Sequence, residues 1–218
     1  MTTRHIDLSH AVEHGMVTYP GLPGPVICDY LSREASRAIY APGVEFQIGR
    51  IEMVANTGTY IDSPFHRYAD GADLARLPLE VLAGLPTVVV QAPGASRAIG
   101  PEAFSGLQLE GKAVLIHTGW SRHWRTPEYL SGHPFLTADA AQHLLDAGAR
   151  LVGIDSLNID DTADMARPVH SRLLGAKVPI VEHLTNLAAL PPNGFRFYAV
   201  PPKVVGFGTF PIRAFAEL

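Results

Sequence analysis

The stretch that decides the fold is "TADAAQHLLDAGARLVGI", residues 137–154, which joins an amphipathic segment to a short apolar run. Thr137 is a suitable N-cap and Gly148 a suitable C-terminal stop for a helix. The apolar residues between them recur on one helix side: Ala140, Leu144, Leu145 and Ala147. The "LVGI" that follows lacks polar alternation, which is typical of a strand buried on both faces.

An equally apolar run, "AVLIH" at residues 113–117, precedes this stretch and completes a strand–helix–strand unit. "LPLEVLAGL", residues 77–85, indicates a second, shorter helix. Further β-branched or apolar runs predict these strands: Ile6–Leu8, Phe46–Val54, Thr87–Gln91 and Phe195–Val200. The sequence therefore predicts an α/β protein with a central sheet, built as a single compact domain over residues 1–218.

The composition excludes several classes of partner. The chain has 218 residues, of which 47% are hydrophobic and 17% charged, and a net charge of −4 with no two Lys or Arg residues adjacent. Nucleic acid and anionic membrane are therefore poor partners. A single cysteine, Cys28, leaves no internal disulfide framework. No segment resembles a signal peptide or a membrane span, so we expect a cytoplasmic protein.

The densest polar run is "NTGTYIDSPFH", residues 56–66. If the preceding strand continues through it, the evenly spaced side chains share one face: Asn56, Tyr60, Asp62 and His66. Gly58 leaves room on that face for a ligand, and Pro64 ends the ladder before His66. Such a row suits a metal or a polarised substrate. The alternative is the polar end of an ordinary strand, with its hydrogen bonds satisfied locally.

Two more polar groups occur downstream. His170 is followed by Glu182, which comes directly after the apolar "VPIV". A carboxylate at the end of a buried run needs a cation, so Glu182 either binds a metal or pairs with a Lys or Arg. Asp155 follows the buried strand at residues 151–154, and we interpret it as a loop or helix cap.

Five segments, in order along most of the chain, resemble the cyclase family of metal-dependent hydrolases, which includes bacterial kynurenine formamidase and isatin hydrolase. These are residues 6–25, 56–66, 113–124, 151–160 and 170–187. The resemblance implies a compact α/β unit with a swivelling β/β/α arrangement. It also implies assembly as a homodimer or homotetramer.

The family's site motif is His-x-Gly-Thr-His-x-Asp-x-Pro-x-His, and two of its histidines are replaced here. Asn56 and Tyr60 stand where the family has metal-binding imidazoles, whereas the remaining positions match: Gly58, Thr59, Asp62, Pro64 and His66. The resemblance implies Asp62, His170 and Glu182 as metal ligands. A divalent Zn or Mn is expected to bind weakly or not at all, because an amide and a phenol are poorer ligands than imidazole.

The resemblance also implies an acid/base role for His66, and the chemistry of the remaining polar groups adds further candidate residues. His66, Glu182 and Tyr60 are the predicted catalytic residues, and Asn56 and Thr59 the predicted substrate-binding residues. The leading hypothesis is a hydrolase of a small amide, lactam or lactone carbonyl compound. Two alternatives stay open: a metal-free enzyme that uses Tyr60, His66 and Glu182, and a non-catalytic homologue that binds a small molecule.

Overall fold

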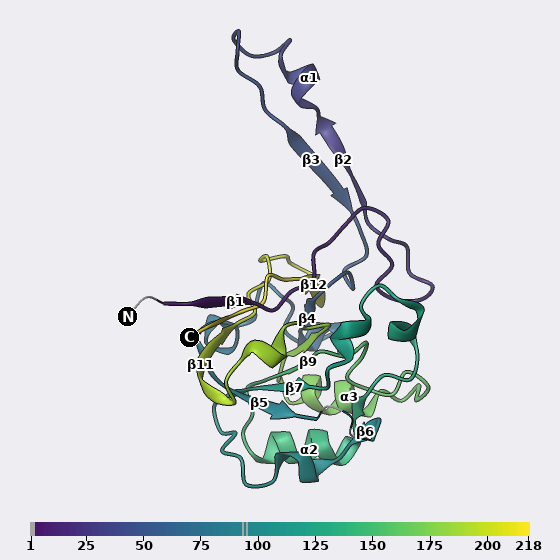
Figure 1. The fold of residues 1–218 in the computed structure, drawn as a ribbon, viewed down its shortest axis with the longest axis vertical. Coiled ribbons are helices and arrows are strands. Elements are labelled where there is room, and N and C mark those ends of the chain that lie inside the picture. Colours follow the sequence, from purple (N-terminus) through teal and green to yellow (C-terminus); the bar gives the residue numbers. More distant parts are fainter. Residues whose placement is uncertain (1–2, 93, 95) are drawn as a thin grey trace.

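Nine strands form one mixed sheet in the computed structural model, which describes residues 3–92, 94 and 96–218 (Figure 1). Their order is β1-β13-β11-β5-β7-β9-β10-β4-β12. The bounds in chain order are β1 His5–Asp7, β4 Tyr60–Asp62, β5 Leu85–Gln91, β7 Ala113–His117, β9 Leu151–Ile154, β10 Ile180–Glu182, β11 Asn193–Tyr198, β12 Thr209–Pro211 and β13 Phe215–Glu217. A short pair, β6 (Ala98–Ile99) and β8 (Phe135–Leu136), lies outside this sheet.

The parallel centre of the sheet is the part that residues 137–154 predict. Strands β5, β7, β9 and β10 run parallel, with Ala113 opposite Leu151. All four residues of β9 are buried, as its unbroken apolar character requires. Helix α2 (Ala138–Asp146) begins after Thr137, whose hydroxyl accepts a hydrogen bond from the Ala140 amide. The predicted α/β class is confirmed.

Helices α2 and α3 (Pro168–Gly175) pack on one face of this parallel centre (Figure 1). Leu144 and Leu173 are fully buried there. The opposite face is covered by loops and short 3₁₀ turns that bring in Leu184 and Leu187. The sheet is thus buried on both sides.

Strand β4 lies between β10 and β12 near one end of the sheet, antiparallel to both. Glu182 is opposite Tyr60 in the first pairing, and Thr209 is opposite Asp62 in the second. Because opposite residues point to the same side, the backbone register alone places these side chains in contact across the strands.

A two-stranded arm projects from the body (Figure 1). It consists of β2 (Val26–Leu31) and β3 (Ile48–Glu52), joined through the short helix α1 (Arg33–Ser36). The predicted strand Phe46–Val54 exists in part, but all five residues of β3 are exposed. Its apolar side chains therefore do not reach this chain's own core.

Two further expectations differ from the structure in extent. The predicted helix at residues 77–85 is reduced to a 3₁₀ turn, Leu79–Val81, because the chain turns at Gly84 and then enters β5. The predicted strand at residues 195–200 is β11, which begins two residues earlier. In the described residues, no helix has the length and apolar character needed to cross a membrane.

Candidate active site

A cavity of about 360 Å³ opens beside the end of β4. Its floor is formed by residues from β4 and β10 and from helix α3, and its walls by loops. The lining residues are Tyr19, Leu22, Asn56, Tyr60, His66, Arg67, Asn158, Met165, Ala166, Arg167, His170 and Glu182. Three segments that are far apart in the sequence therefore meet at one hollow.

Asp62 is fully buried next to this cavity. One carboxylate oxygen, Oδ1, accepts a hydrogen bond from the Thr209 hydroxyl across the β4–β12 pairing. The other, Oδ2, has no hydrogen-bond partner among the described residues. Burial alone raises the pKa of Asp62, but the nearby His66 and His170 outweigh it and hold the pKa below the usual value. A buried carboxylate with one free oxygen is a suitable ligand for a cation.

His66 reaches Asp62 through the same hydroxyl. Its Nδ1 lies 2.8 Å from the Thr209 Oγ1 and 3.8 Å from Asp62 Oδ1. Since the Thr209 proton is donated to Asp62, His66 donates from Nδ1, and its Nε2 carries the lone pair. Gly208 makes this approach possible, because a Cβ there would lie 2.5 Å from the His66 Cα.

His170 is oriented by a carboxylate that lies behind it. Its Nδ1 lies 2.7 Å from Asp160 Oδ2, so Nε2 faces Asp62 Oδ2 and Glu182 Oε1, each at 3.7 Å. Burial opposes the charge on this imidazole, but the hydrogen bond to Asp160 and the negative charges of the nearby Asp62 and Glu182 outweigh it and raise the pKa to about 10. The surrounding carboxylates therefore demand a positive charge here, either a proton or a metal ion.

Glu182 and Tyr60 form a buried pair. The Tyr60 hydroxyl donates to Glu182 Oε2 at 2.6 Å, and the Ile159 amide donates to Oε1 at 2.6 Å. Asn158 adds a longer contact of 3.3 Å. Burial raises the pKa of Glu182 to about 7, and the charge of His170 limits that rise. Burial and Glu182 together raise the pKa of Tyr60 well above its usual value, so the phenol stays protonated.

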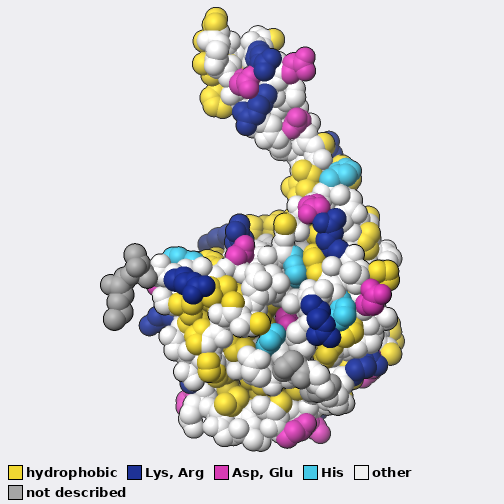
Figure 2. Space-filling model, in the orientation of Figure 1, with side chains coloured by type: hydrophobic (Ala, Val, Ile, Leu, Met, Phe, Trp, Pro, Cys, Tyr) yellow, Lys and Arg dark blue, Asp and Glu magenta, His cyan; other side chains and the backbone are white. Residues whose placement is uncertain are grey.

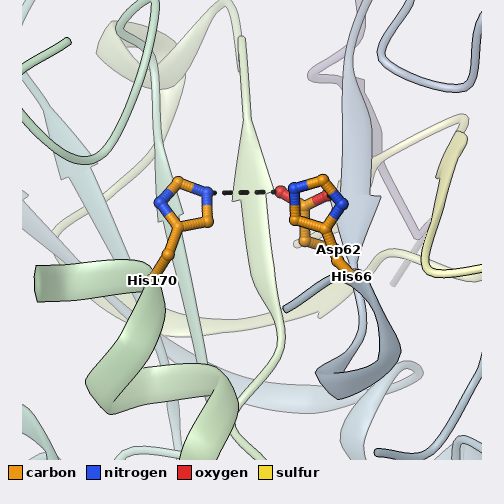
Figure 3. A group of neighbouring side chains, drawn as sticks. All are labelled: Asp62, His66 and His170. Atoms are coloured by element: carbon orange, nitrogen blue, oxygen red, sulfur yellow. Dashed lines mark ion pairs between the residues drawn. The ribbon is translucent and has the colours of Figure 1, made fainter. Parts of the chain in front are cut away.

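Asp62, His66 and His170 fit a divalent cation. Each offers one ligand atom, and these atoms lie within 4.8 Å of one another. Figure 3 shows His170 and Asp62 facing each other, with His66 beside the carboxylate. Imidazole nitrogen and carboxylate oxygen are the donors that Zn²⁺ and Mn²⁺ accept, and the Asp160–His170 contact is typical of metal-binding histidines.

The structure distributes the predicted site residues differently from the expectation. His66, predicted as catalytic, joins this group of three, while Glu182 lies at its edge and is engaged by Tyr60. In the described part of the chain, no Lys or Arg pairs with Glu182. The metal-binding role of Glu182 stays a prediction.

Asn56 and Thr59 are separated by the fold. Asn56 lines the cavity from a loop, whereas Thr59 does not line it. The Thr59 hydroxyl donates to the His183 carbonyl and accepts from the His10 amide. The expected continuous row does not form, because Gly58 adopts φ +66° and strand β4 begins only at Tyr60.

Three residues at the site were missed in the sequence. Asp160 lies in the loop "SLNIDD", residues 156–161, which directly follows Asp155. Thr209 is 147 residues from Asp62 and carries no motif. Asn158 is one of several asparagines in predicted loops, and nothing in the sequence distinguishes it from the others. The role of Asp160 is visible only in the structure, where its carboxylate accepts hydrogen bonds from the amides of Val169 and His170 at the start of α3.

Comparison with known proteins agrees with this geometry. The cyclase family model matches residues 6–161. A kynurenine formamidase of Bacillus anthracis is 29% identical over 98% of this chain and 97% of its own length. A structure described as a potential metal-dependent hydrolase with cyclase activity is 28% identical, with a TM-score of 0.80 over 99% of this chain and 98% of its own. Isatin hydrolase A of Labrenzia aggregata has the same fold, with 23% identity and a TM-score of 0.85 over 99% and 94% of the two chains.

Proposed function

This chain belongs to the cyclase family, and from that premise we propose that it hydrolyses a small amide, lactam or lactone with the help of a divalent metal ion. The observation that carries the proposal is the convergence of Asp62, His66 and His170 beside the cavity. Relatives named as kynurenine formamidase and as metal-dependent hydrolase support the same reaction class.

Asp62 and His170 would hold the ion, together with either His66 or Glu182. A divalent cation held by these side chains would supply an activated water at neutral pH and polarise the substrate carbonyl. Asp62 Oδ2 and the Nε2 of His170 are 3.7 Å apart, and neither atom needs to break a hydrogen bond to another residue to turn toward an ion. Asn56 and Tyr60 leave this donor set smaller than the family's, so we propose weak binding of Zn²⁺ or Mn²⁺.

His66 is the best placed group for moving a proton. It is the more exposed of the two cavity histidines, and its Nε2 is free to face the substrate because Nδ1 is held by Thr209. We assign it the transfer of a proton: Nε2 accepts the proton of the attacking water and delivers it to the leaving nitrogen or oxygen. In this role His66 is not a metal ligand, and Glu182 is the third candidate ligand. Glu182, with a pKa raised to about 7 by burial, is the second group that can accept a proton near neutral pH.

The Tyr60 proton is committed to Glu182 in this arrangement. That contact disfavours the metal-free alternative, in which Tyr60 donates to the substrate carbonyl. The alternative of a non-catalytic homologue is disfavoured by three buried carboxylates around His170, because their burial costs free energy that a bound cation offsets and a neutral small molecule does not: Asp62, Asp160 and Glu182.

The test is turnover of formanilide and of dihydrocoumarin by protein treated with chelator and then supplied with Zn²⁺ or Mn²⁺. We expect hydrolysis only after metal is added, and its loss in Asp62→Asn. Asp29→Asn, which changes a carboxylate on the distant arm, serves as the matched control. Turnover that survives chelation supports the metal-free enzyme. No turnover of amides or lactones under any condition supports the non-catalytic homologue.

We also propose that the chain works as a homodimer, with the arm packed on a second copy. An isolated two-stranded hairpin is only marginally stable in water. The arm nevertheless exposes large apolar side chains, with Tyr30 at 77% and Phe46 at 52% exposure. Closed two-fold assembly is the commonest way in which such a surface becomes buried.

A further inference from the structure

The outer wall of the cavity carries two arginines, Arg67 and Arg167, opposite the acidic floor. Basic side chains and histidines lie close together on the face of the body below the arm (Figure 2). At the floor, the buried carboxylates of Asp62 and Asp160, whose pKa values are both lowered, outnumber the single positive charge of His170. An anionic group on a ligand is therefore repelled by the floor and attracted to the wall.

Arg167 is held in place but keeps its charge available. Its Nη1 donates to the Asp161 carbonyl oxygen at 2.8 Å, which is a neutral acceptor. The Asp161 carboxylate itself pairs with Arg97 at 3.5 Å. Across the described residues, no carboxylate lies within ion-pair distance of the Arg167 guanidinium. A half-buried guanidinium with a neutral anchor has donors left for a bidentate partner.

The backbone of Arg167 supports a role for its side chain. The residue adopts φ 47° and ψ 59°, a left-handed conformation that glycine or asparagine tolerates better than arginine. Local strain of this kind is common at functional sites, and here it occurs at a residue that lines the cavity.

Arg67 adds a second, more mobile cation. Its Nε donates to the Ser171 hydroxyl at 3.3 Å, and its guanidinium lies 5.3 Å from the centre of the Tyr68 ring. This side chain is exposed and likewise makes no ion pair with any described residue. Arg67 therefore attracts an anionic group of the ligand by its charge but does little to fix the position of that group.

We propose that Arg167, assisted by Arg67, binds a carboxylate on the substrate, so that the enzyme acts on anionic amides or lactones. This rests on the proposed hydrolysis. The apolar side chains of Leu22 and Met165 lie in the same cavity, and Met165 is 84% exposed. The substrate class is thus a compact apolar or aromatic body with its reacting carbonyl at the floor and its carboxylate at the wall.

Binding tests the inference without any turnover. Benzoate and benzamide differ mainly in charge, so their affinities are compared by calorimetry on chelator-treated protein, in which no metal can bind the carboxylate. We expect benzoate to bind about tenfold more tightly, as a charge-assisted hydrogen bond allows. Arg167→Gln should remove this preference and leave benzamide binding unchanged.

Arg196→Gln is the matched control, because Arg196 also donates to a neutral carbonyl, that of Gly84 at 2.7 Å, outside the cavity. Arg167→Lys keeps the positive charge and should retain part of the preference for benzoate. It serves as the test variant if Arg167→Gln does not fold. A benzoate preference that survives in folded Arg167→Gln would overturn the assignment, as would the absence of any preference in the native protein.

Turnover then separates this inference from the proposed function. Metal-loaded protein is given formanilide and its 3-carboxy derivative, and we expect about tenfold higher kcat/KM for the carboxylate. Equal turnover of both compounds would refute the role of Arg167 and leave the hydrolase standing. No turnover, with the benzoate preference intact, would refute the hydrolase and leave the anion site standing.

Discussion

The phenol of Tyr60 lies 2.6 Å from Glu182 Oε2, and the two residues are opposite each other in the β4–β10 pairing. Tyr60, which the sequence resemblance places at the position of a family imidazole, thus donates its phenol proton to a carboxylate. The site accommodates tyrosine at this position, because the buried phenol and the buried Glu182 carboxylate satisfy each other's hydrogen-bonding groups.

Removal of the Tyr60 hydroxyl should destabilise the fold. Tyr60→Phe leaves Glu182 with fewer donors in a buried position, at a cost of about 1–3 kcal/mol in unfolding free energy. Urea denaturation measures this. Tyr198→Phe is the control, because Tyr198 makes an equally short bond to Glu217, 2.6 Å, at a half-buried site that water can reach, where the loss should be smaller. Equal effects for both variants would contradict the pairing described here.

Restoring the two imidazoles should strengthen metal binding. Asn56→His with Tyr60→His adds two nitrogen donors next to Asp62 and releases Glu182 from its phenol partner. We expect the native protein to hold Zn²⁺ or Mn²⁺ weakly and the double variant to retain about one ion per chain through gel filtration. Metal analysis of both proteins decides this. Stoichiometric metal in the native protein, or an empty but folded double variant, would count against it.

Metal uptake should displace the proton of His170. The pKa of this imidazole is raised to about 10 by Asp160 and Asp62 against the effect of burial. Below that pH the ion competes with a proton, so the apparent affinity should rise by about tenfold per pH unit from pH 6.5 to 8.5. Titration against a chelating dye measures the slope, and Asp160→Asn should reduce it. A flat response would show that His170 is not a ligand.

Acidification should destabilise the protein through His10. This imidazole stacks on Trp124 with ring centroids 4.0 Å apart, and burial lowers its pKa to about 4, although Asp7 opposes the shift. The unfolded chain therefore binds a proton from pH 6.5 downward that the folded chain excludes until about pH 4. Stability falls across this window, by at most about 1.4 kcal/mol per pH unit.

His10→Phe keeps the ring stacking and removes the titration, so unfolding free energy should depend less on pH between 6.5 and 4. His5→Phe, which removes an exposed imidazole, is the comparison. Chemical denaturation at several pH values measures both. Identical pH profiles for native protein and His10→Phe would exclude His10 as the cause.

The arm should control assembly. Ile27 and Ile51 are opposite each other in β2 and β3, with 40% and 51% exposure. Replacing both by serine should weaken the dimer and leave the body folded, because neither belongs to its core. Sedimentation at micromolar concentration should give twice the 23.5 kDa chain mass for native protein and one chain mass for the variant. Val205→Ser, 80% exposed on another loop, should not change the mass.

The sequence predicts the centre of the fold well, because its signals are local. Thr137, the apolar spacing after it and the unbroken "LVGI" run each depend on neighbours within a few residues. Asp155 is a loop cap as interpreted, and it accepts hydrogen bonds from the amides of Thr118 and Gly119. The arm was harder to predict, since a strand whose apolar side chains are exposed has the same composition as a core strand.

The segments that meet at the site were predictable from the sequence, whereas the exact group of candidate ligands and its supporting contacts were not. Asp62, His66 and His170 lie in recognisable segments, and the structure brings them together. The contacts that orient them come from register and topology, which local sequence does not encode. Thr209 reaches Asp62 only because β12 pairs with β4, and Glu182 reaches Tyr60 only because β10 pairs with it on the other side.

Because β4 pairs with a strand on each side, the site has two parts that tolerate amino-acid substitution to different extents. The spacing of Asp62, Tyr60 and Glu182 is fixed by backbone ladders, so altering it requires sliding a strand and exposing its buried face. The wall around Met165 and Arg167 consists of loop residues that no ladder restrains. New substrates are therefore most readily acquired by substitutions in this wall, while the reacting groups on the floor stay where the sheet holds them.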